Sequence, residues 1–329
     1  MLSSPTSFDG EPACAGAAGT NASPPSSRVL VLLATYNGSR WIREQMESIL
    51  GQQDVSLEIA VRDDASTDGT RWELARFAED RRVRMVTADA PSRSAARNFL
   101  TLIRENPASA FDFIAFADQD DRWNPDKLCR ACQELGASGA AGYSSATVAT
   151  WEDGRQRRLK LSGAPTASDF LFEGAGQGCT FVLSANFYER IRSFLLTHDE
   201  LTNGIHYHDW MVYALARSWG LRWSFDARPS MQYRQHGRND TGARGTLNGI
   251  ARRLARIRDG WYGGQLRAIA EICRTAAPAN PVVLTWHRHL SAQDSWHKRL
   301  ATAKFCLGGG RRRTLDNMVA VMAALRGWI

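Results

Sequence analysis

The sequence predicts a doubly wound α/β fold, in which a largely parallel sheet is covered by helices on both faces. Short apolar runs alternate with segments of helical periodicity four times between residues 29 and 135. Such alternation is typical of parallel strands joined by crossover helices. Polar residues directly follow several of the apolar runs, and sheets of this kind bind ligands beyond the carboxyl ends of their strands. We therefore expect the functional site at that edge.

The elements of the first half follow in order from the apolar pattern. Short apolar runs predict buried strands, and apolar residues that recur every three or four positions predict the helices between them. A cap at Thr67 or Asp68 begins the second helix, and Asn124-Pro125 begins the fourth. The predicted strands are 29–34, 57–61, 83–87 and 111–117, and the predicted helices are 42–50, 68–77, 94–105 and 125–135.

Residues 139–243 have a less regular pattern. We expect strands at 178–183, 221–225 and 231–233, and helices at 186–195 and from His208 through Ala216. Six cysteines lack the spacing of a disulfide framework or a zinc site, and Cys129 and Cys132 fit two small buried residues on a helix. This usage is typical of a reducing cytoplasm.

The two ends differ from the middle in composition. Residues 1–27 are rich in Ser, Pro, Ala and Gly and carry no Lys or Arg, which predicts a disordered tail rather than a secretory signal. Residues 244–329 hold 15 Lys or Arg against 4 Asp or Glu, a net charge of +11, so the whole-chain +7 leaves −4 for residues 1–243. We predict a tail at 1–27, a main domain at 28–243 and a basic helical extension at 244–329.

The basic extension has two interpretations. Apolar residues between Leu247 and Trp261 alternate by three and four with arginines between them, which indicates a helix docked on the main domain or lying on a membrane. Residues 311–313 (Arg-Arg-Arg) fit an anionic-lipid anchor or a solvated helix end. No stretch approaches the ~20 apolar residues of a membrane span. We expect no nucleic-acid binding, because no recognition motif or aromatic strip accompanies the charges.

Three carboxylates stand where the fourth strand ends. Asp118, Asp120 and Asp121 follow the apolar run 113–117. Oxygen ligands beside room for substrate phosphates suit Mg²⁺ or Mn²⁺; the alternative is a solvated acidic turn. The glycine-rich signatures of dinucleotide-binding and P-loop proteins are absent from the sequence, which removes the main support for those two classes.

Several motifs together resemble family 2 glycosyltransferases of the GT-A fold. Residues 34–38 (Ala-Thr-Tyr-Asn-Gly), 63–70 (Asp-Asp-Ala-Ser-Thr-Asp-Gly-Thr) and 118–121 (Asp-Gln-Asp-Asp), with Trp123 and Pro125, carry this resemblance. Residues 97–99, 178–180, 208–210 and 233–237 resemble the bacterial rhamnosyltransferase-like branch that builds surface polysaccharides. The resemblance covers about 28–243 and implies a doubly wound mixed sheet followed by basic C-terminal helices.

The resemblance also implies roles for individual residues, with Mg²⁺ or Mn²⁺ as cofactor. The pyrimidine base would lie against Ala34 and Tyr36 and donate to Asp64, while the ribose would lie near Asp118. The implied assignments are nucleotide-sugar binding by Ala34, Tyr36, Asp64, Arg97 and Asp118, metal binding by Asp120 and His236, base catalysis by Asp209, and acceptor contact or positioning by Trp123, Cys179, His208 and Trp210. For the tryptophans, packing is the alternative. We expect His208 at the surface or in the acceptor groove, and the alternative is a metal ligand.

The chemistry of sugar transfer agrees with these roles. A leaving nucleoside diphosphate needs charge neutralisation, and the acceptor hydroxyl needs a base, for which we predict Asp209; its alternative is a helix cap. A single displacement with one base inverts the anomeric centre. We expect transfer of L-rhamnose from dTDP-rhamnose to a polysaccharide or lipid-linked glycan at the inner face of the membrane. The alternatives are galactofuranose, glucose or galactose from a UDP donor, or a nucleotide-sugar-binding module without activity.

Overall fold

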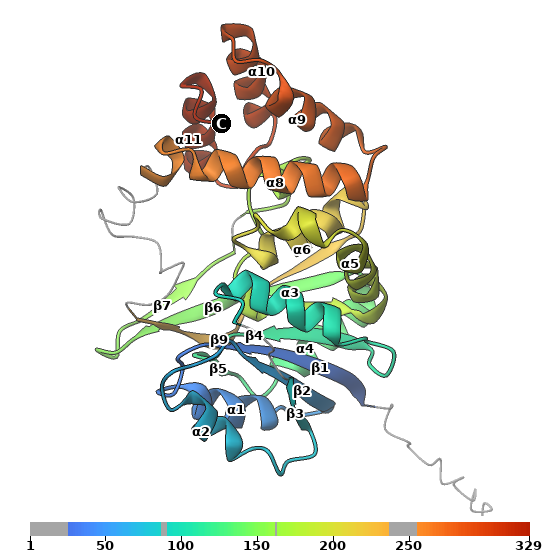
Figure 1. The fold of residues 1–329 in the computed structure, drawn as a ribbon, viewed down its shortest axis with the longest axis vertical. Helices are drawn as coiled ribbons and strands as arrows, with labels where there is room; N and C mark the ends of the chain where they lie inside the picture. The colour runs from blue at the N-terminus through green and yellow to red at the C-terminus, as the bar shows by residue number, and fades with distance from the viewer. Residues whose placement is uncertain (1–25, 87–90, 162, 237–254) are drawn as a thin grey trace, which may run out of the picture.

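The computed structural model describes residues 26–86, 91–161, 163–236 and 255–329. Within these ranges the core is one nine-stranded mixed sheet with the order β3-β2-β1-β4-β8-β6-β9-β5, and β7 pairs with β6. Figure 1 shows helices on both faces of this sheet and a group of C-terminal helices stacked beyond one face. The predicted mixed α/β fold is confirmed.

The first half forms the parallel part of the sheet. β1 pairs in parallel with β2 and β4, and β2 with β3. Along β1, Leu30 and Leu32 pack against one helical layer, whereas Val29 and Val31 pack against the other, as the two-residue period of a strand requires. The elements are β1 Ser27–Thr35, α1 Ile42–Leu50, β2 Val55–Asp63, α2 Thr70–Ala75, β3 Val83–Val86, α3 Ala95–Glu105, β4 Phe113–Ala117 and α4 Lys127–Ser138.

The second half departs from prediction in three places. The segments 221–225 and 231–233 were predicted as two strands, but residues 223–225 and 231–233 belong to one strand, β9, which pairs with β6 across a register shift. The predicted strand 178–183 begins as the 3-10 helix η2 and becomes strand β8 only at Val182. β5, β6 and β7 were not predicted. The elements are β5 Arg122–Trp123, β6 Gly142–Trp151, β7 Gln156–Leu159, η1 Asp169–Leu171, η2 Gly178–Thr180, β8 Val182–Ser184, α5 Ala185–Thr197, η3 Asp199–Thr202, α6 His208–Ser218 and β9 Trp223–Gln235.

The C-terminal helices are α8 Trp261–Ala276, α9 Pro281–Ser291, α10 Trp296–Leu307 and α11 Thr314–Leu325. α8 lies across α6, and α9 to α11 lie beyond it (Figure 1). Leu266, Ile269 and Trp286 are buried in the same hydrophobic cluster as the helices of the main domain, so the described part of the extension docks on that domain. Most of the predicted tail and residues 247–254 of the predicted amphipathic helix lie outside the described residues. Among the described helices, none has the length and apolar character needed to cross a bilayer.

Candidate active site

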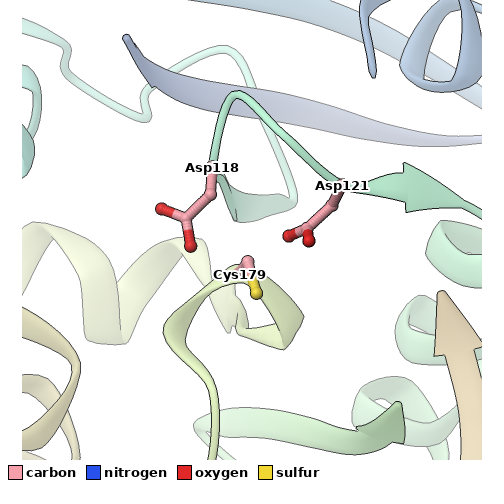
Figure 2. A group of neighbouring side chains, drawn as sticks. All are labelled: Asp118, Asp121 and Cys179. Carbon is pink, nitrogen blue, oxygen red and sulfur yellow. The ribbon is translucent and has the colours of Figure 1, made fainter. Parts of the chain in front are cut away.

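The predicted acidic cluster lies at the carboxyl edge of the parallel strands. Thr35 at the end of β1 pairs with Asp63 at the end of β2, and Leu33 pairs with Ala117 at the end of β4. Figure 2 shows Asp118 and Asp121 pointing from the loop after β4 toward Cys179 on η2. One ligand atom from each of these three residues lies within 4.8 Å of the others. Three strand ends and η2 therefore converge on one site.

The electrostatics of this cluster favour a cation. Burial and the nearby carboxylates of Asp120 and Asp209 raise the pKa of Asp118 to about 7. Burial together with Asp120 and Asp118 raises the pKa of Asp121 well above its ordinary value. The Oδ2 atom of Asp121 is buried without a hydrogen-bond partner within the described part of the chain. Mutually repelling carboxylates with an unsatisfied oxygen are the arrangement that a divalent cation would stabilise.

The other groups at this edge are a thiol, a carboxylate and an imidazole. Burial raises the pKa of the Cys179 thiol well above its usual value. The predicted metal ligands Asp120 and His236 lie together, with His236 Nε2 2.6 Å from Asp120 Oδ2. The His236 ring stacks on Trp41 at a centroid distance of 4.1 Å. The carboxylate oxygens at this edge fit Mg²⁺ or Mn²⁺.

The predicted base-binding segment is held by a residue to which no role was assigned. Gln119 accepts a hydrogen bond from the backbone N–H of Tyr36 at 2.6 Å and donates one to its carbonyl at 2.8 Å. This pair joins the end of β1 to the acidic loop and leaves the Tyr36 side chain outward, since the residue is 54% exposed. The position of Gln119 between two motif aspartates was the signal that could have identified it. Ala34, by contrast, is buried.

The end of β2 has two adjacent carboxylates with separate partners. Asp63 accepts hydrogen bonds from Thr35 and Ser66 and pairs with Arg71. Its pKa is raised by burial, but these hydrogen bonds outweigh that effect and lower it overall.

Asp64 is buried and accepts from the backbone N–H groups of Ser92 and Arg93, so a nucleobase would have to share its remaining lone pairs. Arg62 links Asp64 to Asn98, whereas the predicted Arg97 is exposed and contacts Asn203. In the motif 97–99 it is therefore Asn98 whose side chain reaches the strand ends.

The predicted base Asp209 lies in the first turn of α6. Its Oδ1 accepts a hydrogen bond from the N–H of Trp210 at 2.7 Å, and the cap position of the helix is Tyr207 rather than Asp209. Gly178 on η2 approaches it closely, because a Cβ built on Gly178 would lie 2.9 Å from Asp209 Cβ. Since Asp209 raises the pKa of Asp118, the carboxylate belongs electrostatically to the acidic cluster.

The four side chains predicted to contact or position the acceptor are all buried. His208 stacks on Phe99 at a centroid distance of 4.0 Å, and burial lowers its pKa to about 3. Trp210 donates from its indole to the carbonyl of Phe170. The exposed fractions are 3% for Trp123, 1% for Cys179, 9% for His208 and 5% for Trp210. The structure therefore places them as packing groups under the site, and direct acceptor contact stays a prediction.

A buried lysine, which was not predicted, lies beneath the acidic loop. Lys127 Nζ sits 3.5 Å from the ring centroid of Trp123 and has no hydrogen-bond partner among the described residues. Burial lowers its pKa to about 7, against the opposing effect of Cys179 and Asp121. Its position at the start of α4 gave no local signal, because a lysine in a first helical turn is ordinarily solvated.

Comparison with known proteins identifies the family. The family model described as glycosyl transferase family 2 matches residues 30–203. A dTDP-rhamnosyl transferase, RfbG, from Shigella flexneri is 34% identical over 240 residues, which are 72% of this chain and 83% of that protein.

Two solved structures share the fold. TarS residues 1–349 from S. aureus in complex with UDP-GlcNAc has a TM-score of 0.51 at 14% identity and covers 92% of this chain and 89% of its own. The mannosyltransferase PcManGT from Pyrobaculum calidifontis, in complex with GDP-Man and Mn²⁺, has a TM-score of 0.51 at 20% identity, with coverages of 91% and 86%. With the family model, the relative and the fold in agreement, the chain belongs to glycosyl transferase family 2.

Proposed function

We propose that this glycosyltransferase is a metal-dependent, inverting enzyme that moves L-rhamnose from dTDP-rhamnose onto a hydroxyl of a growing polysaccharide or lipid-linked glycan. The observation that carries the proposal is the convergence of Asp118, Asp120, Asp121 and Asp209, whose charges raise the pKa values within the cluster. The choice of sugar rests on the similarity to the Shigella flexneri dTDP-rhamnosyl transferase.

One set of residues would bind the donor and its leaving diphosphate, and Asp209 would act on the acceptor. Asp120 and His236 would hold Mg²⁺ or Mn²⁺, with Asp118 and Asp121 beside them, and the cation would neutralise the departing diphosphate. The exposed ring of Tyr36 would lie against the pyrimidine base, and Asp64 and Arg97 would contribute to donor binding. Asp209 would take the proton of the acceptor hydroxyl as the new glycosidic bond forms, which inverts the anomeric centre in one step.

A donor panel tests the choice of sugar. Purified protein with Mg²⁺ is heated with dTDP-rhamnose, UDP-glucose, UDP-galactose, UDP-galactofuranose or GDP-mannose, because a ligand that binds only the folded state raises the melting temperature. We expect the largest rise with dTDP-rhamnose and none in EDTA. Stabilisation by UDP-sugars alone would overturn the rhamnosyl assignment in favour of the UDP-donor alternative. Binding of a donor without release of nucleoside diphosphate, whatever the acceptor, would favour a binding module.

The proposal also places the enzyme on the cytoplasmic, anionic face of the cell membrane. α10 exposes Trp296, Leu300 and Leu307, and α11 exposes Leu315, Met318 and Met322, in each case at helical spacing. Leu315 is 82% exposed, which is unusual for a leucine in a helix that packs on a core. Exposed apolar stripes on an extension with a net charge of +11 suit anionic lipid.

Vesicle flotation tests the membrane contact. We expect the protein to float with phosphatidylglycerol vesicles at low salt and to float less after the triple change Leu315→Gln, Met318→Gln and Met322→Gln. Leu196, exposed on α5, offers the matched control Leu196→Gln, which should float normally. Equal flotation of the triple variant and the wild type would refute the role of α11.

A further inference from the structure

α8 of the C-terminal extension clamps the turn that leads into α6. Gln265, a buried side chain, donates from Nε2 to the carbonyl of Gly204 at 2.9 Å and accepts at Oε1 from the N–H of His206 at 3.0 Å. Trp261, at the start of α8, contacts the rings of His206 and Tyr207 edge-on. The chain directly before His208 and Asp209 is therefore held in part by the extension.

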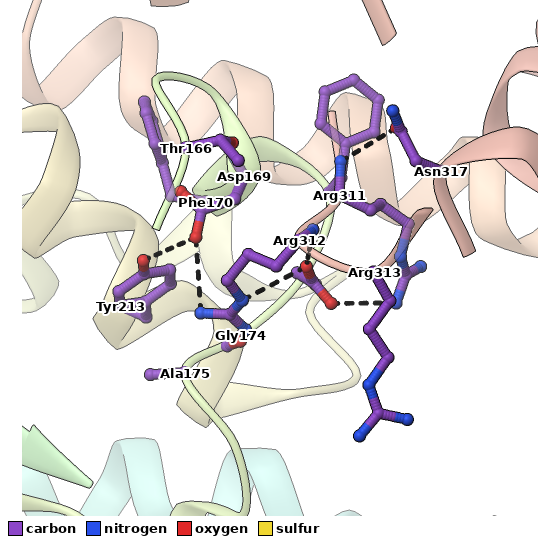
Figure 3. A network of polar contacts seen from close by, with 12 residues as sticks. Thr166, Asp169, Phe170, Gly174, Ala175, Tyr213, Arg311, Arg312, Arg313 and Asn317 are labelled. Carbon is purple, nitrogen blue, oxygen red and sulfur yellow. Dashed lines mark hydrogen bonds and ion pairs between the residues drawn. The ribbon is translucent and has the colours of Figure 1, made fainter. Parts of the chain in front are cut away.

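A second contact ties the extension to the body of α6. The Arg312 guanidinium, 2% exposed, lies 3.3 Å from Asp169 Oδ2 and 3.3 Å from Glu173 Oε1. Asp169 in turn accepts from Tyr213 at 2.8 Å and from Arg217 at 2.9 Å, both on α6. Figure 3 shows Arg312 reaching from the C-terminal helices into this network. A fully buried carboxylate thus bridges the extension and the helix that carries Asp209.

The segment held by Arg312 also touches the residue that follows Asp209. Arg312 donates to the carbonyl of Gly174. A Cβ at Gly174 would lie only 3.3 Å from the Cα of Trp210, and the Trp210 indole donates to Phe170 in the same segment. The first turn of α6 is consequently fixed from both ends, by Gln265 before it and by the Arg312 network after it.

This burial changes the interpretation of the arginine cluster 311–313. The Arg311 side chain is 19% exposed and the Arg312 side chain 2% exposed, and both pair with Glu173 inside the protein. Of the three arginines only Arg313 is exposed. Arg311 and Arg312 were expected to face lipid or solvent. Their charges instead form ion pairs that join the main domain to the extension.

We propose that the C-terminal extension is a positioning element for the reaction, in which Gln265 and Arg312 fix the first turn of α6 and so aim Asp209 at the acceptor hydroxyl. Neither residue touches substrate; both act through the backbone around Asp209. This inference rests on the proposed role of Asp209 as the base. It extends that role to a part of the chain that lies outside the matched residues 30–203 of the family model.

The test combines two disruptions with a control. Gln265→Leu removes both hydrogen bonds to the turn, and Arg312→Gln removes the buried charge; if Arg312→Gln fails to fold, Gln265→Leu still tests the clamp. Gln133→Leu is the matched control, because Gln133 is exposed on α4 and, among the residues that the structure describes, its side chain bonds to Cys129 of its own helix alone. Assays run well below the lowest melting temperature. We expect kcat to fall about 10- to 100-fold in Gln265→Leu, as for a ~1 Å misplacement, with donor KM unchanged.

The double variant Gln265→Leu/Asp209→Asn separates positioning from general damage. If Gln265 acts through Asp209, its loss should cause no further decrease in the residual turnover of Asp209→Asn. An equal fold-decrease in both backgrounds, or a rise in donor KM with kcat unchanged, would overturn the positioning role. Full turnover in the single variant Asp209→Asn would instead overturn the proposed base itself, so the two failures are distinguishable.

Discussion

The contact between Gly178 and Asp209 allows a quantitative prediction for Gly178→Ala. The added Cβ would lie 2.9 Å from Asp209 Cβ, 3.4 Å from Asp209 Cγ and 3.3 Å from His208 Nε2. Carbon atoms attract best at ~3.5–4.0 Å, so η2 and the first turn of α6 must separate by about 0.5–1 Å. Such overpacking costs ~1–3 kcal/mol of folding free energy. Displacement of a catalytic group by this amount should lower kcat by up to about 100-fold.

The assay measures kcat, donor KM and the melting temperature on the same preparations. Gly136→Ala is the control, because Gly136 is exposed in α4 and a Cβ there meets nothing within 4 Å. That variant should keep its activity and gain about 0.5–1 kcal/mol from helix propensity. If Gly178→Ala retains full kcat, then the close approach of η2 does not govern the position of Asp209, and the reasoning fails.

Three further predictions concern the metal site, the buried imidazole and the base platform. Asp120→Asn should weaken Mg²⁺-dependent binding of nucleoside diphosphate in calorimetry, because a ligand charge is lost; turnover that persists in EDTA would contradict metal dependence. The pKa of His208 is about 3 in the fold, against about 6.5 when unfolded, so the unfolded state binds the extra proton and the contribution of His208 to stability should fall as pH drops below about 6.5. The raised pKa values of Asp118 and Asp121 act in the opposite direction, so the wild type is compared with His208→Gln. Between pH 6.5 and 5 the free energy of unfolding of the wild type, measured in urea, should fall by about 1.6 kcal/mol relative to that of His208→Gln, and an identical pH dependence of the two proteins would count against this. Tyr36→Ala should raise donor KM by the factor that corresponds to losing a base–aromatic stack of ~1–3 kcal/mol, whereas Tyr36→Phe should leave KM unchanged. Equal KM values for the two variants would show that the Tyr36 ring does not contact the base.

The parallel half of the fold was predictable because its signals are local. Each strand is a short apolar run, and the carboxylates of the site follow β2 and β4 directly in the chain. Their meeting at one edge then follows from parallel pairing alone. For the same reason Asp118, Asp120 and Asp121 were found without any structural information.

The second half of the sheet lacked such signals. β6 is built largely from small and polar residues, and Ser144 and Ser145 are fully buried with partners far along the chain, at Ala175 and Ser230. Because these buried positions of β6 are polar, its sequence shows no apolar alternation and resembles that of a loop. Arg312 is a similar case, because its partner Asp169 lies outside any local window and the arginine run by itself indicates solvent or lipid.

The central claim, that Asp209 is the base of a metal-dependent sugar transfer, is tested most directly by Asp209→Asn. Asparagine keeps the size and the hydrogen-bonding shape of the side chain but cannot take a proton at neutral pH. The measurement is release of dTDP from dTDP-rhamnose in the presence of acceptor, with donor affinity and melting temperature determined on the same sample. We predict a decrease in turnover of about a hundredfold to ten-thousandfold, with donor binding and stability retained. Full turnover in Asp209→Asn would contradict the account, because the base would then lie elsewhere.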